Sequence, residues 1–350
     1  MKQDYCIIFD YSSNNGGATH VAKEEMKRLR IMGHAVTFIS VDGQNKFIFI
    51  LNILMSNLKI MIYFLFSRKN FIIHTFSFFP IVLLCCLIRP RRFLFVIHDY
   101  ITICPSKARY NFVKQNICEI EGASLSCLRE NCGYAVKKKL VHSLFTMTFR
   151  YICKWRNLQI RTLSIKSSKL LGKHLDTVTT VIPNLYVWGM PQKQNLTETV
   201  NNKIPYIVFA GRPTKDKGYD RFRRIRSRRY HKVHVGASGI NTFSDTYLGW
   251  LDPERVKSIV TKAAVIIYPA RQIDCDPLIM QLALEYKIPM VVDEKNAAAS
   301  TVHKFFGQNC VLSNWDNFCI DSLNFHSTNN FNYSHITIEE INKLYLDAFS

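Results

Sequence analysis

Short apolar runs alternate along the chain with longer segments of helical spacing. Residues 5–9 form an apolar run of strand length, and residues 18–32 place apolar side chains among charged ones at the spacing of an amphipathic helix. Gly33 follows, and residues 35–39 form a second apolar run. A strand, a helix and a second strand in this order predict a βαβ unit, which implies a parallel sheet.

The same alternation continues in two successive runs. The further predicted strands are residues 71–74 and 93–97 in the first run, and residues 206–210, 233–236, 265–268 and 289–292 in the second. A polar stretch, residues 192–195, separates the two runs and is interpreted as the interdomain linker. A final helix, residues 338–349, is expected to start after Thr337, with Glu340 completing a capping box.

We therefore expect an α/β protein with two Rossmann-like, doubly wound domains that face a cleft. The predicted domains are residues 1–190 and 191–335. Residues 336–350 form a C-terminal helix whose return to the first domain is left open. A chain of 350 residues suits two domains of about 100–200 residues each.

One segment, residues 47–66, is apolar enough to raise the question of a membrane span. Asn52, Asn57 and Lys59 interrupt it near the middle, where a lysine costs about 2.5–3.5 kcal/mol. We therefore predict a buried or membrane-surface helix in preference to a span. Residues 76–88 are too few to span a bilayer and suit a core helix.

The formal net charge of +20 is unevenly distributed. Residues 1–160 contain 22 Lys and Arg against 9 Asp and Glu. This excess indicates acidic partners, and nucleic acid, anionic lipid and a pyrophosphate-linked substrate are all compatible with it. Residues 221–232 are arginine-rich, as in some nucleic-acid-binding segments, but their place between two predicted strands favours a short helix with a solvated basic face.

The chain contains 11 cysteines. Because residues 1–10 indicate a strand and not a secretory signal, we expect a reduced, cytosolic compartment with mostly free thiols. Four of the cysteines follow one another at irregular spacing: Cys104, Cys118, Cys127 and Cys132. The absence of a Cys-x-x-Cys pair favours packed thiols over a zinc site.

Two candidate sites follow predicted strands of the second domain. In the first, Gly211 comes directly after residues 206–210, and Arg212 and Lys217 follow it. Open α/β sheets bind ligands at the carboxyl ends of their strands, and two cations there suit a diphosphate. A solvated basic turn is the alternative interpretation.

The second candidate site follows residues 265–268. Asp274 and Asp276 lie in the next loop, and a helix is expected to begin at Leu278. The N-terminus of a helix can receive phosphate or sugar oxygens, and a nearby acid can bond sugar hydroxyls. An acidic N-cap for that helix is the alternative interpretation.

Taken together, these segments resemble the retaining GT-B glycosyltransferases of family four. The matching positions are Gly16 and Gly17, Gly33 and His34, His98, Asp99 and Tyr100 with Cys104 and Pro105, Pro183 and Asn184, Gly211 and Arg212 with Lys217 and Gly218, and the strand that leads to Pro269. Their order and spacing extend the resemblance from Ile7 to Phe349. The resemblance implies an N-terminal acceptor-binding domain and a C-terminal nucleotide-sugar-binding domain.

The resemblance also implies roles for individual residues. The residues that would bind the donor are Gly16, Gly17, Gly211, Asp276, Pro277 and Leu278. His98 would orient a sugar hydroxyl and support positive charge at the anomeric carbon. Arg212 and Lys217 would stabilise the departing diphosphate without a metal ion, and Asp274 would be the first donor-site acid.

One position departs from the family pattern. The family usually carries two glutamates eight positions apart at the donor site, and the corresponding residues here are Asp274 and Leu282. The second acid, which in the family holds the nucleotide ribose, is therefore lost, and Pro277 replaces a loop glycine. This departure keeps a catalytically impaired, GT-B-like binding protein open as an alternative to an enzyme.

The expected activity is transfer of a hexose-type sugar, with retention, from a nucleoside diphosphate sugar to a polyprenyl-diphosphate-linked glycan. Such an enzyme would serve bacterial surface-polysaccharide (O-antigen or capsule) biosynthesis, and we expect no cofactor, metal ion or nucleic-acid partner. The basic first domain, with apolar residues 47–66 and 144–155, would lie peripherally on the anionic inner face of the bacterial inner membrane. A nucleic-acid-binding protein is the less favoured alternative, suggested by the charge alone.

Overall fold

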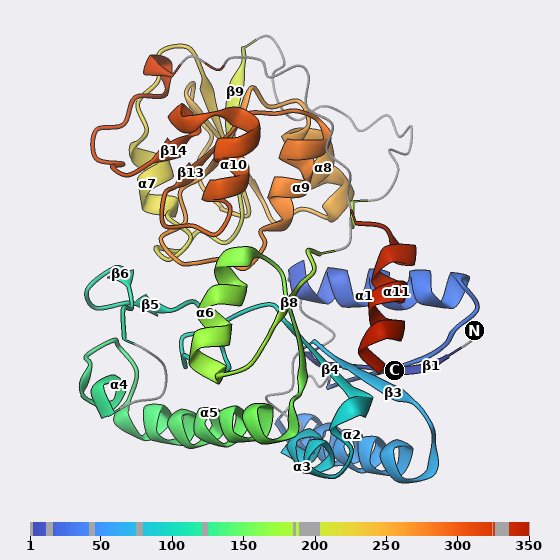
Figure 1. The fold of residues 1–350 in the computed structure, drawn as a ribbon. Helices are drawn as coiled ribbons and strands as arrows, with labels where there is room; N and C mark the ends of the chain where they lie inside the picture. The colour runs from blue at the N-terminus through green and yellow to red at the C-terminus, as the bar shows by residue number, and fades with distance from the viewer. Residues whose placement is uncertain are drawn as a thin grey trace.

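The protein contains two α/β domains, each built on a six-stranded sheet (Figure 1). The computed structural model describes residues 3–11, 17–41, 46–74, 80–120, 125–184, 187–188, 204–323, 325 and 336–349. Every strand pairing within the two large sheets is parallel. The predicted fold class, two Rossmann-like α/β domains, is therefore confirmed.

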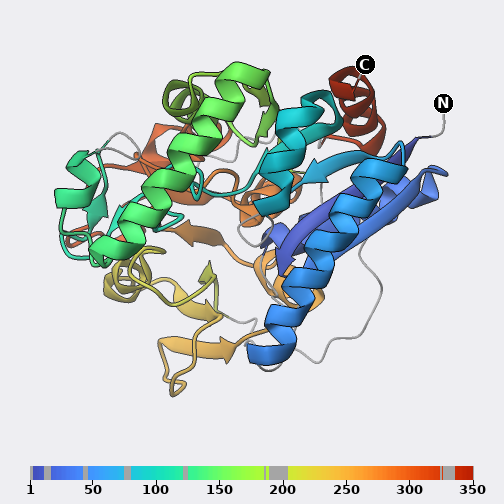
Figure 2. The ribbon, with the colours of Figure 1, turned by 90° about the horizontal axis from the view of Figure 1, so that it is seen from below.

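The N-terminal sheet has the strand order β2-β1-β3-β4-β7-β8. Its strands are β1 (Asp4–Tyr11), β2 (Ala35–Val41), β3 (Asn70–Ile73), β4 (Phe93–Ile97), β7 (Gln159–Thr162) and β8 (Thr180–Val181). Its helices are α1 (Gly17–Ile31), α2 (Lys46–Phe66), α3 (Pro80–Ile88), α5 (Val136–Arg156) and α6 (Ile165–Leu175), with a 3-10 turn at Pro90–Arg92. Helices α2, α3 and α5 cover one face of the sheet, and α1 and α6 cover the other (Figures 1 and 2).

A small excursion separates β4 from α5. It contains the antiparallel pair β5 (Tyr110–Asn111) and β6 (Asn116–Ile117), followed by the short helix α4 (Leu125–Arg129). The four cysteines noted in the sequence belong to this excursion, and all four carry free thiols.

The C-terminal sheet has the strand order β11-β10-β9-β12-β13-β14. Its strands are β9 (Tyr206–Ala210), β10 (His231–Val235), β11 (Asp245–Gly249), β12 (Val265–Tyr268), β13 (Met290–Asp293) and β14 (Val311–Leu312). Its helices are α7 (Tyr219–Arg224), α8 (Pro253–Val260), α9 (Leu278–Glu285) and α10 (Ala299–Phe306), with 3-10 turns at Gln308–Cys310 and Ile320–Ser322. All residues of β4, β12 and β13 are buried, because a parallel sheet covered on both faces needs apolar side chains on both.

The last helix, α11 (Ile338–Phe349), returns to the N-terminal sheet and packs beside α1 (Figure 1). Tyr345 of α11 is fully buried there. The predicted capping box is confirmed: the Thr337 N–H donates to Glu340 Oε2 over 2.7 Å, and the Glu340 N–H donates to Thr337 Oγ1 over 3.2 Å. The cap holds the start of a helix whose apolar face belongs to the N-terminal core.

Helix α2 is apolar and yet largely exposed. It is long and apolar enough to cross a bilayer by length and composition, and only 11% of its apolar window is buried. Ile60 and Phe64 belong to the core, whereas Leu54, Met55 and Leu58 are exposed. The interpretation of residues 47–66 as a buried helix is therefore wrong, and the membrane-surface alternative stays a prediction.

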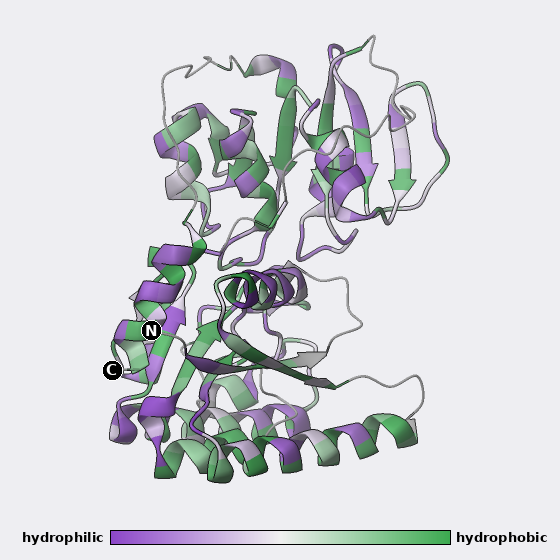
Figure 3. Ribbon diagram, turned by 90° about the vertical axis from the view of Figure 1, so that its right-hand side faces the viewer, coloured by the Kyte–Doolittle hydropathy of each residue, from purple (hydrophilic) through white to green (hydrophobic). Residues whose placement is uncertain are grey.

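Apolar residues also follow the outer side of α5, which lies on the same face of the domain as α2 (Figures 2 and 3). Helix α3 fills the space between them, with Val82, Cys85 and Cys86 buried. The core helix predicted over residues 76–88 begins at Pro80, and residues 76–79 lie outside the described residues.

Candidate functional site

The two domains approach each other at the N-termini of α1 and α9. Gly17 opens α1 and Leu278 opens α9. A Cβ atom at Gly17 would lie only 3.0 Å from Leu278 Cδ1, so this contact joins the two domains. Because a helix N-terminus carries partial positive charge and unpaired N–H groups, two such ends in one place form a setting for an anion.

The N-terminus of α9 has no side-chain cap. Pro277 occupies the N-cap position, makes no side-chain hydrogen bond to the helix, and no acidic residue lies in the first turn. The alternative that Asp274 or Asp276 caps this helix is therefore wrong. The first turn keeps donors that a phosphate or sugar oxygen could use.

The loops that follow β9 and β12 are tied together at the carboxyl end of the sheet. Gly218 has φ +70°, and a Cβ there would lie 1.9 Å from the carbonyl oxygen of Pro269, so any other residue would force the loops apart. The Asp216 carbonyl accepts from the N–H groups of Arg271 and Gln272, at 2.9 and 3.0 Å. The predicted Arg212–Gly218 and Asp274–Leu278 segments therefore belong to one site.

Lys217 and Asp274, both predicted site residues, form an ion pair. Lys217 Nζ donates to both carboxylate oxygens of Asp274 over 2.9 Å each. The Tyr268 hydroxyl and the Gln272 side-chain amide also donate to this carboxylate. Burial and the charge of Asp274 raise the pKa of Tyr268 well above its usual value, so its phenol keeps the proton that it donates. Asp274 thus holds Lys217 in place at the end of β12.

Arg212 differs from Lys217. Its side chain is exposed and forms no hydrogen bond or ion pair within the described part of the chain. It lies close enough to Tyr268 for its charge to lower the pKa of that phenol, against the larger effect of burial. Arg212 is therefore a fork-shaped cation beside the ion pair, placed to meet a ligand oxygen.

Asp276 forms hydrogen bonds to Asn184, at the point where the chain passes from the first domain to the second. Its Oδ2 accepts from the Asn184 N–H over 2.9 Å, and its carbonyl accepts from Asn184 Nδ2 over 3.4 Å. Burial raises the pKa of Asp276 to about 6. The predicted donor-binding role of Asp276 stays a prediction, and the structure adds a structural role in the crossing.

His98 follows β4 and is half-buried. Its Nε2 lies 2.7 Å from His74 Nδ1, and the two rings stack with centroids 5.0 Å apart. Burial, assisted by the charge of Arg161, lowers the pKa of His98 to about 3. His98 is therefore neutral at physiological pH and can act on a ligand only through hydrogen bonds.

The loop after His98 reaches the loop between β12 and α9, residues 269–277, which we call the donor-side loop. Burial and the neighbouring Cys275 thiol raise the pKa of the Tyr100 phenol, and Cys275 belongs to the N-terminal core although it follows Asp274 in the chain. The structure thus brings the His98 segment next to the segment that carries Asp274. Gly16 lies outside the described residues.

Leu282 is fully buried in the core of the C-terminal domain. Its neighbour Gln281 is also buried and donates to the Asn184 carbonyl over 3.2 Å. The position that the family fills with a second acid is therefore occupied by a packing residue, and Gln281 is engaged at the domain crossing.

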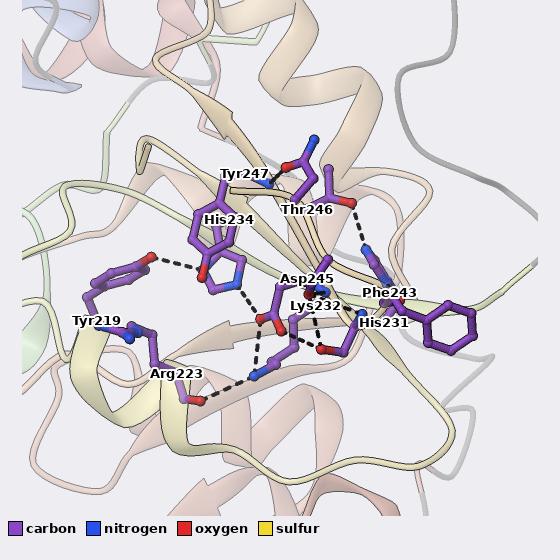
Figure 4. Close-up of polar contacts among 12 residues, drawn as sticks. Tyr219, Arg223, His231, Lys232, His234, Phe243, Asp245, Thr246 and Tyr247 are labelled. Carbon is purple, nitrogen blue, oxygen red and sulfur yellow. Dashed lines mark hydrogen bonds and ion pairs between the residues drawn. The ribbon is translucent and has the colours of Figure 1, made fainter. Parts of the chain in front are cut away.

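The arginine-rich stretch forms α7 and the start of β10. Arg221 pairs with Asp293 over 2.7 Å, and Lys232 pairs with Asp245 over 3.1 Å. Asp245 also accepts from His234 over 2.8 Å at the outer edge of the sheet (Figure 4). Part of this basic stretch is therefore neutralised within the domain.

Sequence reasoning missed four residues beside the predicted ones: Tyr268 and Gln272, which donate to Asp274, His74, which contacts His98, and Glu25, whose Oε2 lies 3.9 Å from His74 Nε2. Tyr268 and His74 each end or follow a buried strand, and a polar side chain in that position was the available signal. Gln272 and Glu25 carry no such signal, because a glutamine in a loop and a glutamate in a charged helix are ordinary.

No protein-family model matches the sequence, and no curated protein matches it. The structure matches solved glycosyltransferases over most of its length. A sucrose-phosphate synthase from Thermosynechococcus elongatus has a TM-score of 0.59 at 12% identity, covering 99% of this chain and 90% of that chain. WaaG, a glycosyltransferase involved in lipopolysaccharide biosynthesis, has a TM-score of 0.56 at 10% identity, covering 99% and 90%.

HepE from Anabaena, solved in complex with UDP and glucose, has a TM-score of 0.53 at 10% identity, covering 85% of this chain and 82% of that chain. At such low identities the similarity establishes the fold. This chain has the two-domain GT-B fold, and its structural neighbours are glycosyltransferases.

Proposed function

We propose that this protein is a glycosyltransferase that transfers a sugar from a nucleoside diphosphate sugar to a hydroxyl acceptor. The observation that carries the proposal is the meeting of the α1 and α9 N-termini beside Arg212 and Lys217. Two helix N-termini and two cations suit a diphosphate better than any neutral ligand. Fold neighbours solved with UDP or UDP-glucose support this donor class.

In the proposed reaction the departing diphosphate gains negative charge as the bond to the sugar breaks. Arg212, Lys217 and the first turn of α9 would stabilise that charge, because fixed donors and cations in a partly buried site lower the barrier without reorganising. Asp274 would keep Lys217 oriented. The neutral His98 would accept or donate a hydrogen bond to a hydroxyl of the sugar.

We further propose that the transfer retains the anomeric configuration and needs no metal ion. The family resemblance supports retention, and the two cations supply the charge that a divalent ion would supply. Activity that survives EDTA and a product whose anomeric proton coupling matches the donor are the expected results. Loss of activity in EDTA that Mg²⁺ restores would contradict the metal-free site.

The proposed acceptor is a polyprenyl-diphosphate-linked glycan of a bacterial surface polysaccharide. The support is the face formed by α2, α3 and α5, which we call the apolar face. It exposes apolar side chains from two 21-residue helices in the half of the chain that carries most of the net positive charge. We propose that this face lies peripherally on the anionic inner leaflet of the bacterial inner membrane.

The function is tested first by thermal unfolding with UDP-, GDP- and other activated sugars. A true donor at a hundred times its dissociation constant adds about 2.7 kcal/mol of stability, and the same donor should then give a labelled product with membrane extract as acceptor. Absence of stabilisation by every activated sugar would contradict the proposal.

A binding protein without turnover is the second candidate, and the buried Leu282 favours it. It predicts stabilisation by a nucleoside diphosphate sugar together with neither transfer nor hydrolysis. Donor hydrolysis in the absence of acceptor therefore separates the two candidates.

A further inference from the structure

Three ionisable side chains lie behind His98 in the core of the N-terminal domain. His74 follows β3, Glu25 belongs to α1 and Arg161 belongs to β7. The exposed fractions of these three residues are 3%, 0% and 0%. His74 Nδ1 lies 2.7 Å from His98 Nε2, and on its other side His74 Nε2 lies 3.9 Å from Glu25 Oε2. Arg161 Nη1 lies 3.6 Å from the same Glu25 oxygen.

These contacts leave polar atoms unsatisfied in the core. Three buried atoms have no hydrogen-bond partner among the described residues: Glu25 Oε1, Glu25 Oε2 and His74 Nε2. Burying such groups without hydrogen bonds is destabilising, and an apolar side chain of similar volume would avoid that cost. Packing alone therefore does not explain why Glu25 and His74 are buried.

Arg161, in contrast, is well bonded. Its guanidinium donates to the Ile182 and Pro183 carbonyls over 3.1 and 2.7 Å, and to the Tyr345 hydroxyl over 2.7 Å. All three acceptors are neutral, so the positive charge still needs a counter-ion. Arginine stays charged even when buried, and Glu25 is the carboxylate at ion-pair distance from it in the described part of the chain.

The charge of Glu25 decides where the protons of the two histidines lie. A neutral imidazole has one donor nitrogen and one acceptor nitrogen, and burial lowers the pKa of both His74 and His98. Burial raises the pKa of Glu25, and the charge of Arg161 opposes that rise. Beside the Glu25 carboxylate that pairs with Arg161, His74 carries its proton on Nε2 and turns the bare Nδ1 toward His98. His98 must then donate through Nε2, which leaves its Nδ1 as an acceptor.

We infer that Glu25 and His74 are positioning residues that fix the tautomer and the orientation of His98, so that His98 offers an acceptor nitrogen to a hydroxyl of the donor sugar. The sugar part of this inference rests on the proposed function, but the tautomer does not. No proton is transferred in this arrangement. The buried carboxylate acts only by selecting which nitrogen of each ring holds its hydrogen.

The test is ¹⁵N NMR of the full-length protein with labelled histidine, in which long-range couplings identify the protonated ring nitrogen. The His98 signal is assigned by its loss in His98→Ala. We expect the Nε2–H tautomer of His98 in the wild type. In Glu25→Gln the new amide can donate to His74 Nε2, so His74 then donates through Nδ1 and His98 changes to the Nδ1–H tautomer.

Glu25→Gln leaves Arg161 without its counter-ion and can fail to fold, so His74→Phe is the second variant. It keeps the Glu25–Arg161 pair and a stacked ring but removes the bond to His98, and we expect mixed tautomers. His234→Phe is the matched control, because His234 is a buried histidine with both nitrogens bonded in the other domain (Figure 4). The control should leave the His98 signal unchanged.

Kinetics supply the second measurement. His74→Phe should lower kcat at least tenfold with the donor KM nearly unchanged, and it should cause no further loss in a His98→Ala background. Equal losses in both backgrounds, or a His98 tautomer that neither variant alters, would overturn the inference. If the tautomer responds as expected but no activated sugar is transferred, the proposed function fails while the positioning of His98 stands.

Discussion

The two cations of the proposed diphosphate site are not equivalent. Lys217 is held by Asp274 and the Tyr268 hydroxyl lies 3.4 Å from its ammonium, whereas Arg212 is exposed. A diphosphate that enters the site therefore meets an exposed, fork-shaped donor on one side and a point charge held by an ion pair on the other. Asp274 lowers the net charge of the site, so we expect it to orient Lys217 and not to attract the donor.

Arg212→Ala and Lys217→Ala should each lower the rate of transfer at least tenfold, because each removes charge that stabilises the leaving diphosphate. Lys217→Ala should also lower the thermal stability more, because it leaves the Asp274 carboxylate without its cation. Transfer rates and melting temperatures of the purified variants measure both effects. Arg255→Ala removes an exposed cation of the same domain and should alter neither; near-wild-type turnover in both site variants would refute the donor-site assignment.

A second prediction at this scale concerns pH. In the folded protein the pKa of His98 is lowered from the usual value near 6.5 to about 3. Below pH 6.5, His98 is therefore protonated in the unfolded chain but stays neutral in the folded protein. His98 thus favours unfolding as the pH falls, by at most about 1.4 kcal/mol per pH unit. His98→Asn should therefore lose less stability than the wild type between pH 7 and pH 5 in urea titrations. Parallel stability curves would show that His98 titrates normally in the folded protein.

The candidate site could be predicted in part because strand ends are visible in the sequence. Arg212, Lys217 and Asp274 follow apolar runs, and parallel strands bring such positions to one edge. The pairing of Lys217 with Asp274, 57 residues apart, could not be predicted, since it depends on how two loops pack around Gly218. The burial of Glu25 could not be predicted either, because it depends on a strand and a helix far away in the chain.

At the scale of the element, strands were easier to predict than short helices. The runs that form β4, β9 and β12 are apolar throughout, so their type and place are clear. Helix α8 begins at Pro253, before its first apolar residue, Val256, because the Asp252 side chain accepts from the Arg255 N–H over 2.9 Å and caps the helix there. The two-residue strands β5 and β6 are too short to show an alternation of apolar and polar positions, and they are defined by their pairing with each other.

The sequence of α2 could not show which side of the helix is buried and which is exposed. It is apolar nearly all round, so no periodic stripe marks the inner face. One of its polar residues is turned inward: the Asn57 side chain donates to the Ile53 carbonyl and accepts from the Ile81 N–H at the start of α3. Leu54 and Leu58 consequently lie on the outer side, where they are exposed.

A third prediction follows for this element. Leu54→Glu and Met55→Glu should weaken binding to anionic vesicles at least tenfold, because each loses apolar contact with the membrane and adds repulsion from its anionic surface. Neither should unfold the protein, since both side chains are already exposed, by 62% and 57%. Vesicle sedimentation and thermal melting measure the two effects. Ile240→Glu, at a site 87% exposed in the other domain, is the control; unchanged binding in both α2 variants would rule out α2 as the contact.

At the scale of the whole molecule, the donor-side loop is shared by both domains. Cys275 packs in the N-terminal core, and Asp276 bonds to Asn184. Lys166 of α6 donates to the carbonyl of Asn296 over 3.4 Å, and the Asn296 side chain donates to the Gln272 carbonyl of the loop over 3.2 Å. A ligand that contacts Asp274 therefore also contacts a segment that both domains hold. Closure of the domains around a donor would act directly on this loop, as it does in enzymes that exclude water from the reacting bond.

The apolar face lies on the side of the N-terminal domain away from the C-terminal domain (Figure 1). If that face rests on a membrane, the donor domain stays in the aqueous phase, where nucleotide sugars are dissolved. The acceptor, held by its lipid, then approaches from the N-terminal side. The donor would thus arrive from the aqueous phase and the acceptor from the membrane, which suits a transferase that joins a soluble donor to a lipid-linked acceptor.

The last prediction concerns how the protein leaves such a membrane. Each Lys or Arg near an anionic surface contributes about 1 kcal/mol, and salt screens that attraction over roughly 8–10 Å, while apolar contact is not screened. We therefore expect sedimentation with anionic vesicles at low salt, partial release at high salt and complete release only with detergent. Complete release by salt would mean that α2 contributes nothing and that charge alone binds the protein. Resistance to both salt and carbonate would mean that residues 47–66 span the bilayer, and absence of binding at low salt would require a soluble acceptor in place of the lipid-linked one.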